Sequence, residues 1–169
     1  ILYDLQKEQA MSIGNVSEFG FNQKSSQLAY LVDATDQIGN GVYLLTLSTK
    51  STELLDASTA SYQRLTWDDQ NAKKEEYGEK GNQLAVLRGN KADSLWQQPN
   101  DLLVFYDLDK ETKKSILTSD SSGFPVDFVI SDKESLSFSE DGMSVFFGIK
   151  EQEEKVKMSK DTIANVDVW

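Results

Sequence analysis

The feature that most constrains the fold is a strand-rich unit that occurs twice in full, with partial copies at both ends of the chain. Its clearest marker is the run FSEDG at 138–142, followed by the segment MSVFF at 143–147. An Asp-Gly pair between two apolar runs predicts two antiparallel strands joined by a tight turn. Related strand–turn–strand passages lie upstream, around Phe21 and Trp67. The repetition predicts an all-β chain built from four-stranded antiparallel sheets.

Each four-stranded unit is called a blade. Counting strands divides the chain into the end of one blade at 1–15, complete blades at 16–58 and 62–120, and an incomplete blade at 135–169. Such units bury their faces against one another, so we predict a segment of a β-propeller, with a β-sandwich as the alternative. The spacing from Phe21 to Trp67 is 46 residues, close to the roughly 40–50 residues of a blade. The next spacing, from Trp67 to Phe138, is 71 residues, and longer loops absorb the difference.

The hairpin at 138–147 resembles the F-S-P-D-G hairpin of WD-like propeller repeats, with Glu140 where proline is usual. Such repeats occur in Tol-type propellers and in the N-terminal propeller of prolyl oligopeptidase and dipeptidyl peptidase relatives. The runs LAYL at 28–31 and GVYLLTL at 41–47 are similar to propellers of exported bacterial peptidases, as is the closing strand Val166–Trp169.

The resemblance implies a non-catalytic propeller that gates the access of short peptides to a serine peptidase's α/β-hydrolase domain. That domain, with the nucleophile, acid and histidine, would lie outside this chain. The implied partners are the rest of the parent propeller, the hydrolase domain and peptides, and the implied location is periplasmic or secreted. The alternative function is a protein- or glycan-binding scaffold propeller without an enzymatic partner domain.

Composition narrows the chemistry further. The 169 residues include no histidine and no cysteine, which removes the usual general base, thiol catalysis and zinc-thiolate sites. We therefore predict no catalytic residue, cofactor or metal in this chain. With 28 acidic and 17 basic residues the net charge is -11, which argues against nucleic-acid binding. No apolar run approaches the ~20 residues of a membrane span.

The candidate binding residues are few. Trp96 lies in a predicted loop and is either an exposed contact for a partner or a packing residue against a neighbouring blade. Asp68-Asp69 and Asp107-Leu108-Asp109 could offer oxygen ligands to a hard cation. Neither continues into a calcium loop, and aspartates at turns commonly hydrogen-bond the backbone. No pair of carboxylates has a separation that the sequence fixes, so a glycosidase site is the weakest hypothesis.

The incomplete blade count predicts unpaired strand edges at both ends of the chain. We expect such a chain to self-associate, to pair with a missing part of its parent, or to be kept apart by its charged loops. A monomer with fully paired edges would indicate a closed sandwich instead.

Overall fold

A computed structural model describes residues 1–70, 80–89, 92 and 94–155. These residues form 14 β-strands and no helix, and every strand pair in them is antiparallel. The all-β prediction is therefore confirmed. No helix within the described ranges is long and apolar enough to cross a membrane.

The first complete sheet contains four consecutive strands in the order β3-β4-β5-β6. Its strands are β3 (Val16–Phe21), β4 (Gln27–Val32), β5 (Gly41–Thr46) and β6 (Ser51–Ala57). The two central strands are nearly continuous apolar runs because both of their faces are covered. The outer strand β6 is largely exposed and carries polar residues.

The second sheet repeats the same order, β7-β8-β9-β10. Its strands are β7 (Ser61–Trp67), β8 (Leu84–Gly89), β9 (Asn100–Tyr106) and β10 (Lys113–Leu117). Alternate residues of its central strands serve two different cores. Leu84 and Val86 face the first sheet, whereas Ala85 and Leu87 face the C-terminal hairpin, as the period of two in a strand requires.

Two-stranded hairpins flank these sheets. The N-terminal hairpin pairs β1 (Leu2–Asp4) with β2 (Gln9–Met11). At the other end, β11 (Phe128–Ile130) pairs with β14 (Ile149–Glu151), and β12 (Ser137–Phe138) pairs with β13 (Val145–Phe146). The two pairs are nested, so they form one long hairpin with an irregular segment in its arms. Its first strand starts at Phe128, whereas the sequence predicts an incomplete blade that starts at residue 135.

The predicted Asp-Gly turn closes this hairpin. The Ser139 hydroxyl accepts a hydrogen bond from the Ser144 backbone N–H at 3.0 Å. The Asp141 carboxylate accepts one from the Met143 N–H, also at 3.0 Å. Gly142 has a φ of 69°, which a residue without Cβ adopts at little cost.

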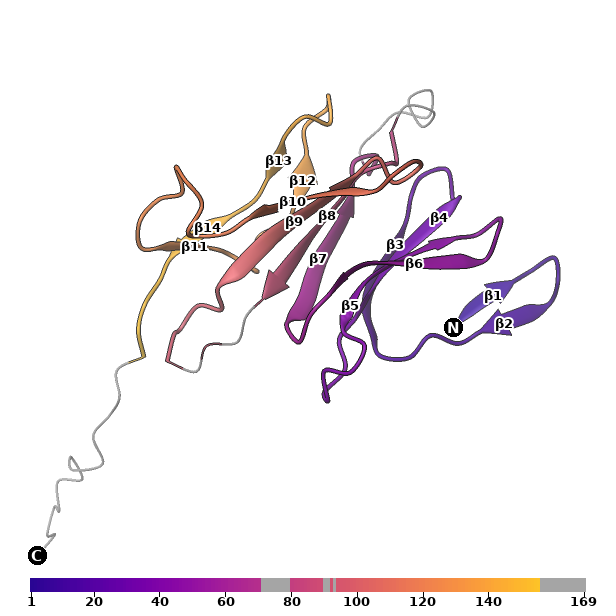
Figure 1. The fold of residues 1–169 in the computed structure, drawn as a ribbon, viewed down its shortest axis with the longest axis horizontal. Coiled ribbons are helices and arrows are strands. Elements are labelled where there is room, and N and C mark those ends of the chain that lie inside the picture. The colour runs from indigo at the N-terminus through magenta and orange to yellow at the C-terminus, as the bar shows by residue number, and fades with distance from the viewer. Residues whose placement is uncertain (71–79, 90–91, 93, 156–169) are drawn as a thin grey trace, which may run out of the picture.

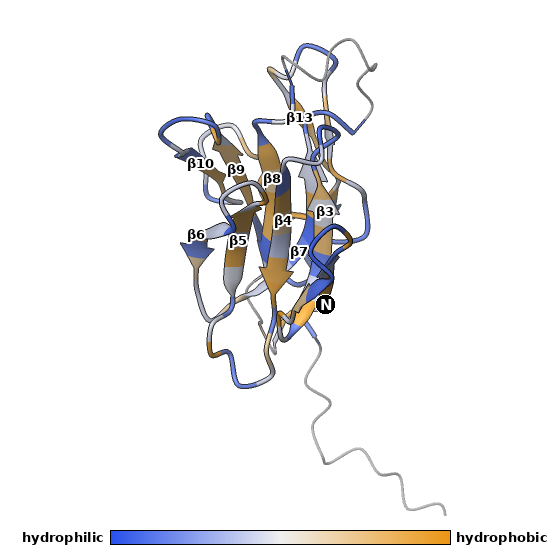
Figure 2. Ribbon diagram, turned by 90° about the vertical axis from the view of Figure 1, so that its right-hand side faces the viewer, coloured by the Kyte–Doolittle hydropathy of each residue, from blue (hydrophilic) through white to orange (hydrophobic). Residues whose placement is uncertain are grey.

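The N-terminal hairpin, the first sheet, the second sheet and the C-terminal hairpin are four layers. They follow one another in chain order across the molecule (Figure 1). A separate apolar core fills each of the three spaces between neighbouring layers. Apolar residues concentrate on the central strands β4 and β8, and the turns are polar (Figure 2). The described residues form no closed ring, and the predicted strand Val166–Trp169 lies outside them.

Candidate functional site

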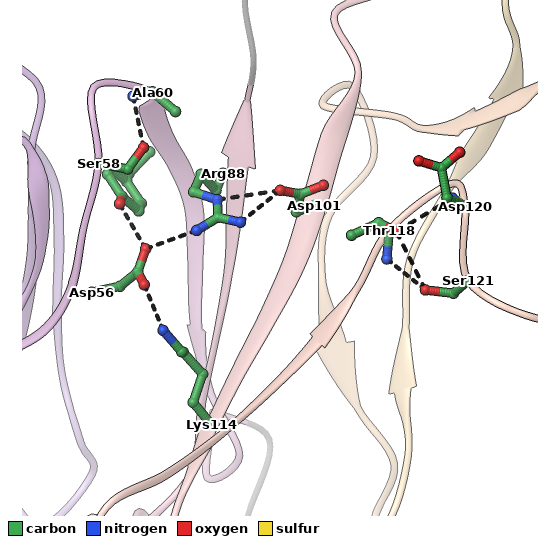
Figure 3. A network of polar contacts seen from close by, with 10 residues as sticks. Asp56, Ser58, Ala60, Arg88, Asp101, Lys114, Thr118, Asp120 and Ser121 are labelled. Atoms are coloured by element: carbon green, nitrogen blue, oxygen red, sulfur yellow. Dashed lines mark hydrogen bonds and ion pairs between the residues drawn. The ribbon is translucent and has the colours of Figure 1, made fainter.

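A cluster of charged and polar side chains lies between β6 of the first sheet and the strands of the second sheet (Figure 3). Asp56 of β6 is 8% exposed and forms its centre. Its carboxylate accepts hydrogen bonds from the Lys114 ammonium and from the Tyr62 hydroxyl, each at 2.7 Å. Arg88 Nη1 lies 3.3 Å from the same carboxylate. We call Asp56, Tyr62, Arg88, Asp101 and Lys114 the inter-sheet clamp.

Arg88 joins the two carboxylates of the clamp. Its Nη2 donates to Asp101 Oδ2 at 2.8 Å, and its Nε donates to the same oxygen at 3.2 Å. The planar guanidinium can therefore hold Asp101 on one side and Asp56 on the other, which a lysine could not reproduce. Asp101 and Arg88 are cross-strand neighbours in the second sheet, so the bond to Asp56 is the one that ties this pair to the first sheet.

The electrostatics of the clamp favour the ionised state of Asp56. Burial alone would raise the pKa of this carboxyl, but hydrogen bonds from Lys114 and Tyr62 and the positive charges of Lys114 and Arg88 outweigh burial and lower it. The pKa of the Tyr62 hydroxyl is raised, first by burial and then by its hydrogen bond to Asp56. Tyr62 therefore remains a proton donor to Asp56 at neutral pH.

The composition of the clamp indicates a structural role rather than catalysis. Two carboxylates face two basic groups, so the cluster is neutral at pH 7, and Arg88 is occupied by both acids. An anionic substrate would have to displace one of them. The clamp therefore fixes the position of one sheet against the other.

The acidic pair Asp68-Asp69 follows the end of β7 and is buried. Asp68 Oδ1 accepts hydrogen bonds from the backbone N–H groups of Gly81 at 2.9 Å and Gln83 at 3.3 Å. Asp69 Oδ2 accepts one from the Gln23 N–H at 2.8 Å, which links this turn to the first sheet. Burial raises the pKa of both carboxyls more than these hydrogen bonds lower it.

The two acidic motifs make contacts within the protein. No group of three potential metal ligands occurs in the described ranges. Asp107 instead accepts a hydrogen bond from Lys113 at 2.7 Å, and that bond lowers the pKa of its carboxyl. The contacts of Asp68, Asp69 and Asp107 are those of turn residues.

Trp96, the candidate contact residue, lies in the loop before β9 with 62% of its surface exposed. Its backbone N–H donates to the Glu153 carbonyl at 2.8 Å, so the segment after β14 holds the loop in place. The Lys155 ammonium lies 5.8 Å from the centre of the indole ring, within the range of a cation–π interaction. The structure thus presents an indole face next to a cation, on a loop anchored through its backbone.

Two buried asparagines, Asn40 and Asn100, are not singled out by sequence reasoning. Each lies at the start of a third strand and is 3% exposed. Asn40 Nδ2 donates to the Ala60 carbonyl at 3.3 Å, just before β7, and Asn100 Nδ2 donates to the Ile130 carbonyl at 2.7 Å, at the end of β11. Each asparagine therefore bonds its own sheet to the first strand of the next layer. The available signal is an Asn two positions before the apolar runs that begin at Val42 and Leu102.

Comparison of the chain with family models, with curated proteins and with solved structures finds no match.

Proposed function

We propose that the chain is a segment of a β-propeller, the non-catalytic part of a prolyl-oligopeptidase-like serine peptidase. In this proposal the propeller restricts entry to short peptides, and the hydrolase domain lies outside the chain. The observation that carries the propeller assignment is the position of the first strand of each unit: β3 lies beside β7, and β7 lies beside β12. In a propeller, the first strands of successive blades converge on a central channel.

Polar contacts between the first strands support this arrangement. Arg64 has a φ of 60° in a bulge of β7, which leaves its backbone N–H available outside the strand pair. That N–H donates to Glu18 of β3 at 2.7 Å. The Arg64 Nε donates to the Asp132 carbonyl in the next layer, also at 2.7 Å. One bulged residue of β7 therefore connects to β3 on one side and to the segment between β11 and β12 on the other.

The number of layers favours a propeller over a two-layer sandwich. A β-sandwich buries one face of each of two sheets and leaves the outer faces to solvent. Here the sheet β7–β10 is covered on both faces, by the first sheet and by the C-terminal hairpin. The first sheet is covered on its outer face in part by the hairpin β1–β2. Four layers in chain order fit radial repetition.

The peptidase assignment rests on the resemblance of the hairpin at 138–147, and a gating role requires rigid contact between blades. The inter-sheet clamp supplies such a contact, because it fixes two neighbouring sheets with a neutral set of charges. In the parent enzyme, Arg88→Met should loosen this contact. We expect a larger rise in kcat/KM for long peptides than for dipeptide substrates.

The decisive test is the reading frame that encodes the chain. We expect it to continue into a hydrolase domain with a G-x-S-x-G nucleophile, an acid and a histidine. A reading frame without such a domain would exclude the peptidase role. It would favour the scaffold alternative, for which the specific observation is the exposed, anchored Trp96 beside Lys155.

A further inference from the structure

An apolar groove lies beside β1, on the face of the first sheet that points away from the second sheet. Its volume is about 560 Å³, and its lining includes Leu2, Tyr3, Phe19, Phe21, Leu28 and Tyr30. The hairpin β1–β2 covers the rest of this face, where Leu2 and Met11 pack with Leu45. One face of the first sheet is therefore covered by two strands instead of four.

Equivalent positions in the first strands of the three units show that a covering layer is missing over the groove. The first strands of the three units end at Phe21, Trp67 and Phe138, which pair with Leu28, Leu84 and Val145. The residues two positions earlier are Phe19, Leu65 and Leu136. Leu65 packs on the core between the two sheets. Leu136 is 7% exposed and packs in the core between the second sheet and the C-terminal hairpin. Phe19 is 65% exposed, because the described residues place only the hairpin β1–β2 on this side of the first sheet.

The C-terminal hairpin is the missing half of such a layer. Its two arms correspond to the first and second strands of a complete sheet. The strands β1 and β2 correspond to the third and fourth strands, because they are followed directly by the first strand of a new sheet, β3. Within the described ranges, β1 pairs only with β2, and β13 and β14 pair only with β12 and β11. In the complete sheets the second strand pairs with the third, so the free edge of β1 and the free edge of β13 and β14 lack that partner, and each is a template for another strand.

We propose that a second copy of this chain docks head to tail, so that its C-terminal hairpin fills the groove and pairs with β1. The pairing reproduces the antiparallel contact between second and third strands in both complete sheets. Phe146, which is 62% exposed, would cover Phe19 and Phe21 of the other copy.

The direction in which Phe146 points supports this fit. It follows Val145 as Ala29 follows Leu28 and as Ala85 follows Leu84. Ala29 packs in the core toward the second sheet, and Ala85 packs in the core toward the C-terminal hairpin. The equivalent position therefore faces the layer that comes next, which for Phe146 is the first sheet of the second copy. The proposed contact continues the two interfaces that the structure already contains.

The geometry also sets the number of copies. The described part of each chain forms two complete sheets and two half-sheets, which make three sheets when the halves combine. Two copies then make a ring of six, within the range of roughly four to eight blades. The same contact occurs twice around a two-fold axis, so the half-sheets of both copies are completed. The proposal rests on the layered propeller of the proposed function but not on its peptidase role.

The test is the mass of the 169-residue chain in solution by sedimentation velocity. The monomer mass is 19.0 kDa, and we expect twice that value. Phe19→Glu and Phe146→Glu should each weaken dimerisation at least tenfold with an unchanged circular-dichroism spectrum, because both side chains are exposed in one copy. Ile116→Glu is the matched control and should remain dimeric. Ile116 is 42% exposed and lies opposite Leu103, whose side chain faces the first sheet.

Mixing the two variants tests the head-to-tail arrangement. In a mixture of Phe19→Glu and Phe146→Glu, one of the two contacts joins native residues, so dimers should reappear. A mixture that stays monomeric would overturn the pairing of Phe19 with Phe146. A wild-type monomer would overturn the second copy as the occupant of the groove. Assemblies of more than two copies would overturn the closed ring. None of these outcomes affects the reading-frame test of the peptidase role.

Discussion

At the scale of the residue, we expect the strongest electrostatic effect on stability from removing the charge of Asp56. Its three polar partners come from three strands of the second sheet, so removing its charge leaves Lys114 and Arg88 partly uncompensated at the interface. Breaking a buried pair by removing one partner costs about 3–5 kcal/mol, and the partial exposure of both cations reduces this. We expect Asp56→Asn to lower the free energy of unfolding at pH 7 by about 2 kcal/mol, measured by urea denaturation.

The same residue gives a pH dependence of known sign. The pKa of Asp56 is lower in the folded than in the unfolded chain, so its contribution is complete above its ordinary unfolded pKa of about 3.9. The contribution is lost as the pH falls through the folded pKa. The difference in stability between wild type and Asp56→Asn should therefore shrink in acid. A difference that stayed constant down to pH 3 would contradict the clamp. Asp109→Asn, in an exposed turn, is the control and should change stability little.

Asp69 should behave in the opposite way. Its Oδ1 atom is buried and has no hydrogen-bond partner within the described ranges, and burial raises the pKa of the carboxyl. A folded pKa above the unfolded pKa means that the ionised form destabilises the fold at neutral pH and that protonation in acid relieves this. We expect Asp69→Asn to raise the free energy of unfolding at pH 7 by on the order of 1 kcal/mol. The gain should disappear below the unfolded pKa, and thermal melts at pH 7 and pH 3.5 would measure both values.

At the scale of the element, Asn40 and Asn100 join consecutive layers. Each side chain bonds a backbone carbonyl in the next unit, and loss of such a buried partner costs roughly 1–3 kcal/mol. We expect Asn40→Ala and Asn100→Ala to destabilise the protein by about 2 kcal/mol each, measured by urea denaturation. Because the two residues lie in different sheets and bond different carbonyls, their effects should add in the double variant. A double variant no less stable than either single one would show that the bonds do not act separately.

The sequence predicts the strands of the two complete sheets well, because each is a short apolar run bounded by polar turns. The Asp-Gly hairpin at 138–147 is confirmed for a related reason, since its turn chemistry is local. The pairing of β11 with β14 is not predicted, because the chain between β11 and β12 is irregular and leaves no period to follow.

The sites were less predictable than the strands. Trp96 is exposed in a loop, as one of its two interpretations requires, but its anchoring by Glu153 depends on a distant segment. The inter-sheet clamp joins residues from five strands, and no spacing in the sequence links them. Such contacts arise from the stacking of sheets, which a strand pattern alone does not determine.

At the scale of the whole molecule, the net charge of -11 opposes the proposed association of two copies. The contact surface itself is mainly apolar, so salt should screen the repulsion between copies without weakening their attraction. We expect the dimer dissociation constant to fall several-fold between 20 mM and 300 mM NaCl, as measured by sedimentation equilibrium. A dissociation constant that rises with salt would indicate ion pairs across the contact instead.

The asparagine bonds also bear on how such a chain can change its length over evolution. Asn40 and Ala60 are 20 positions apart, whereas Asn100 and Ile130 are 30 apart, yet both pairs make the same connection. The bond fixes where the next unit begins, whatever the length of the turn, outer strand and link that follow the third strand. Insertions and deletions can therefore accumulate at the periphery while the central register is inherited unchanged. Repeats of this kind can diverge in length and composition and still stack.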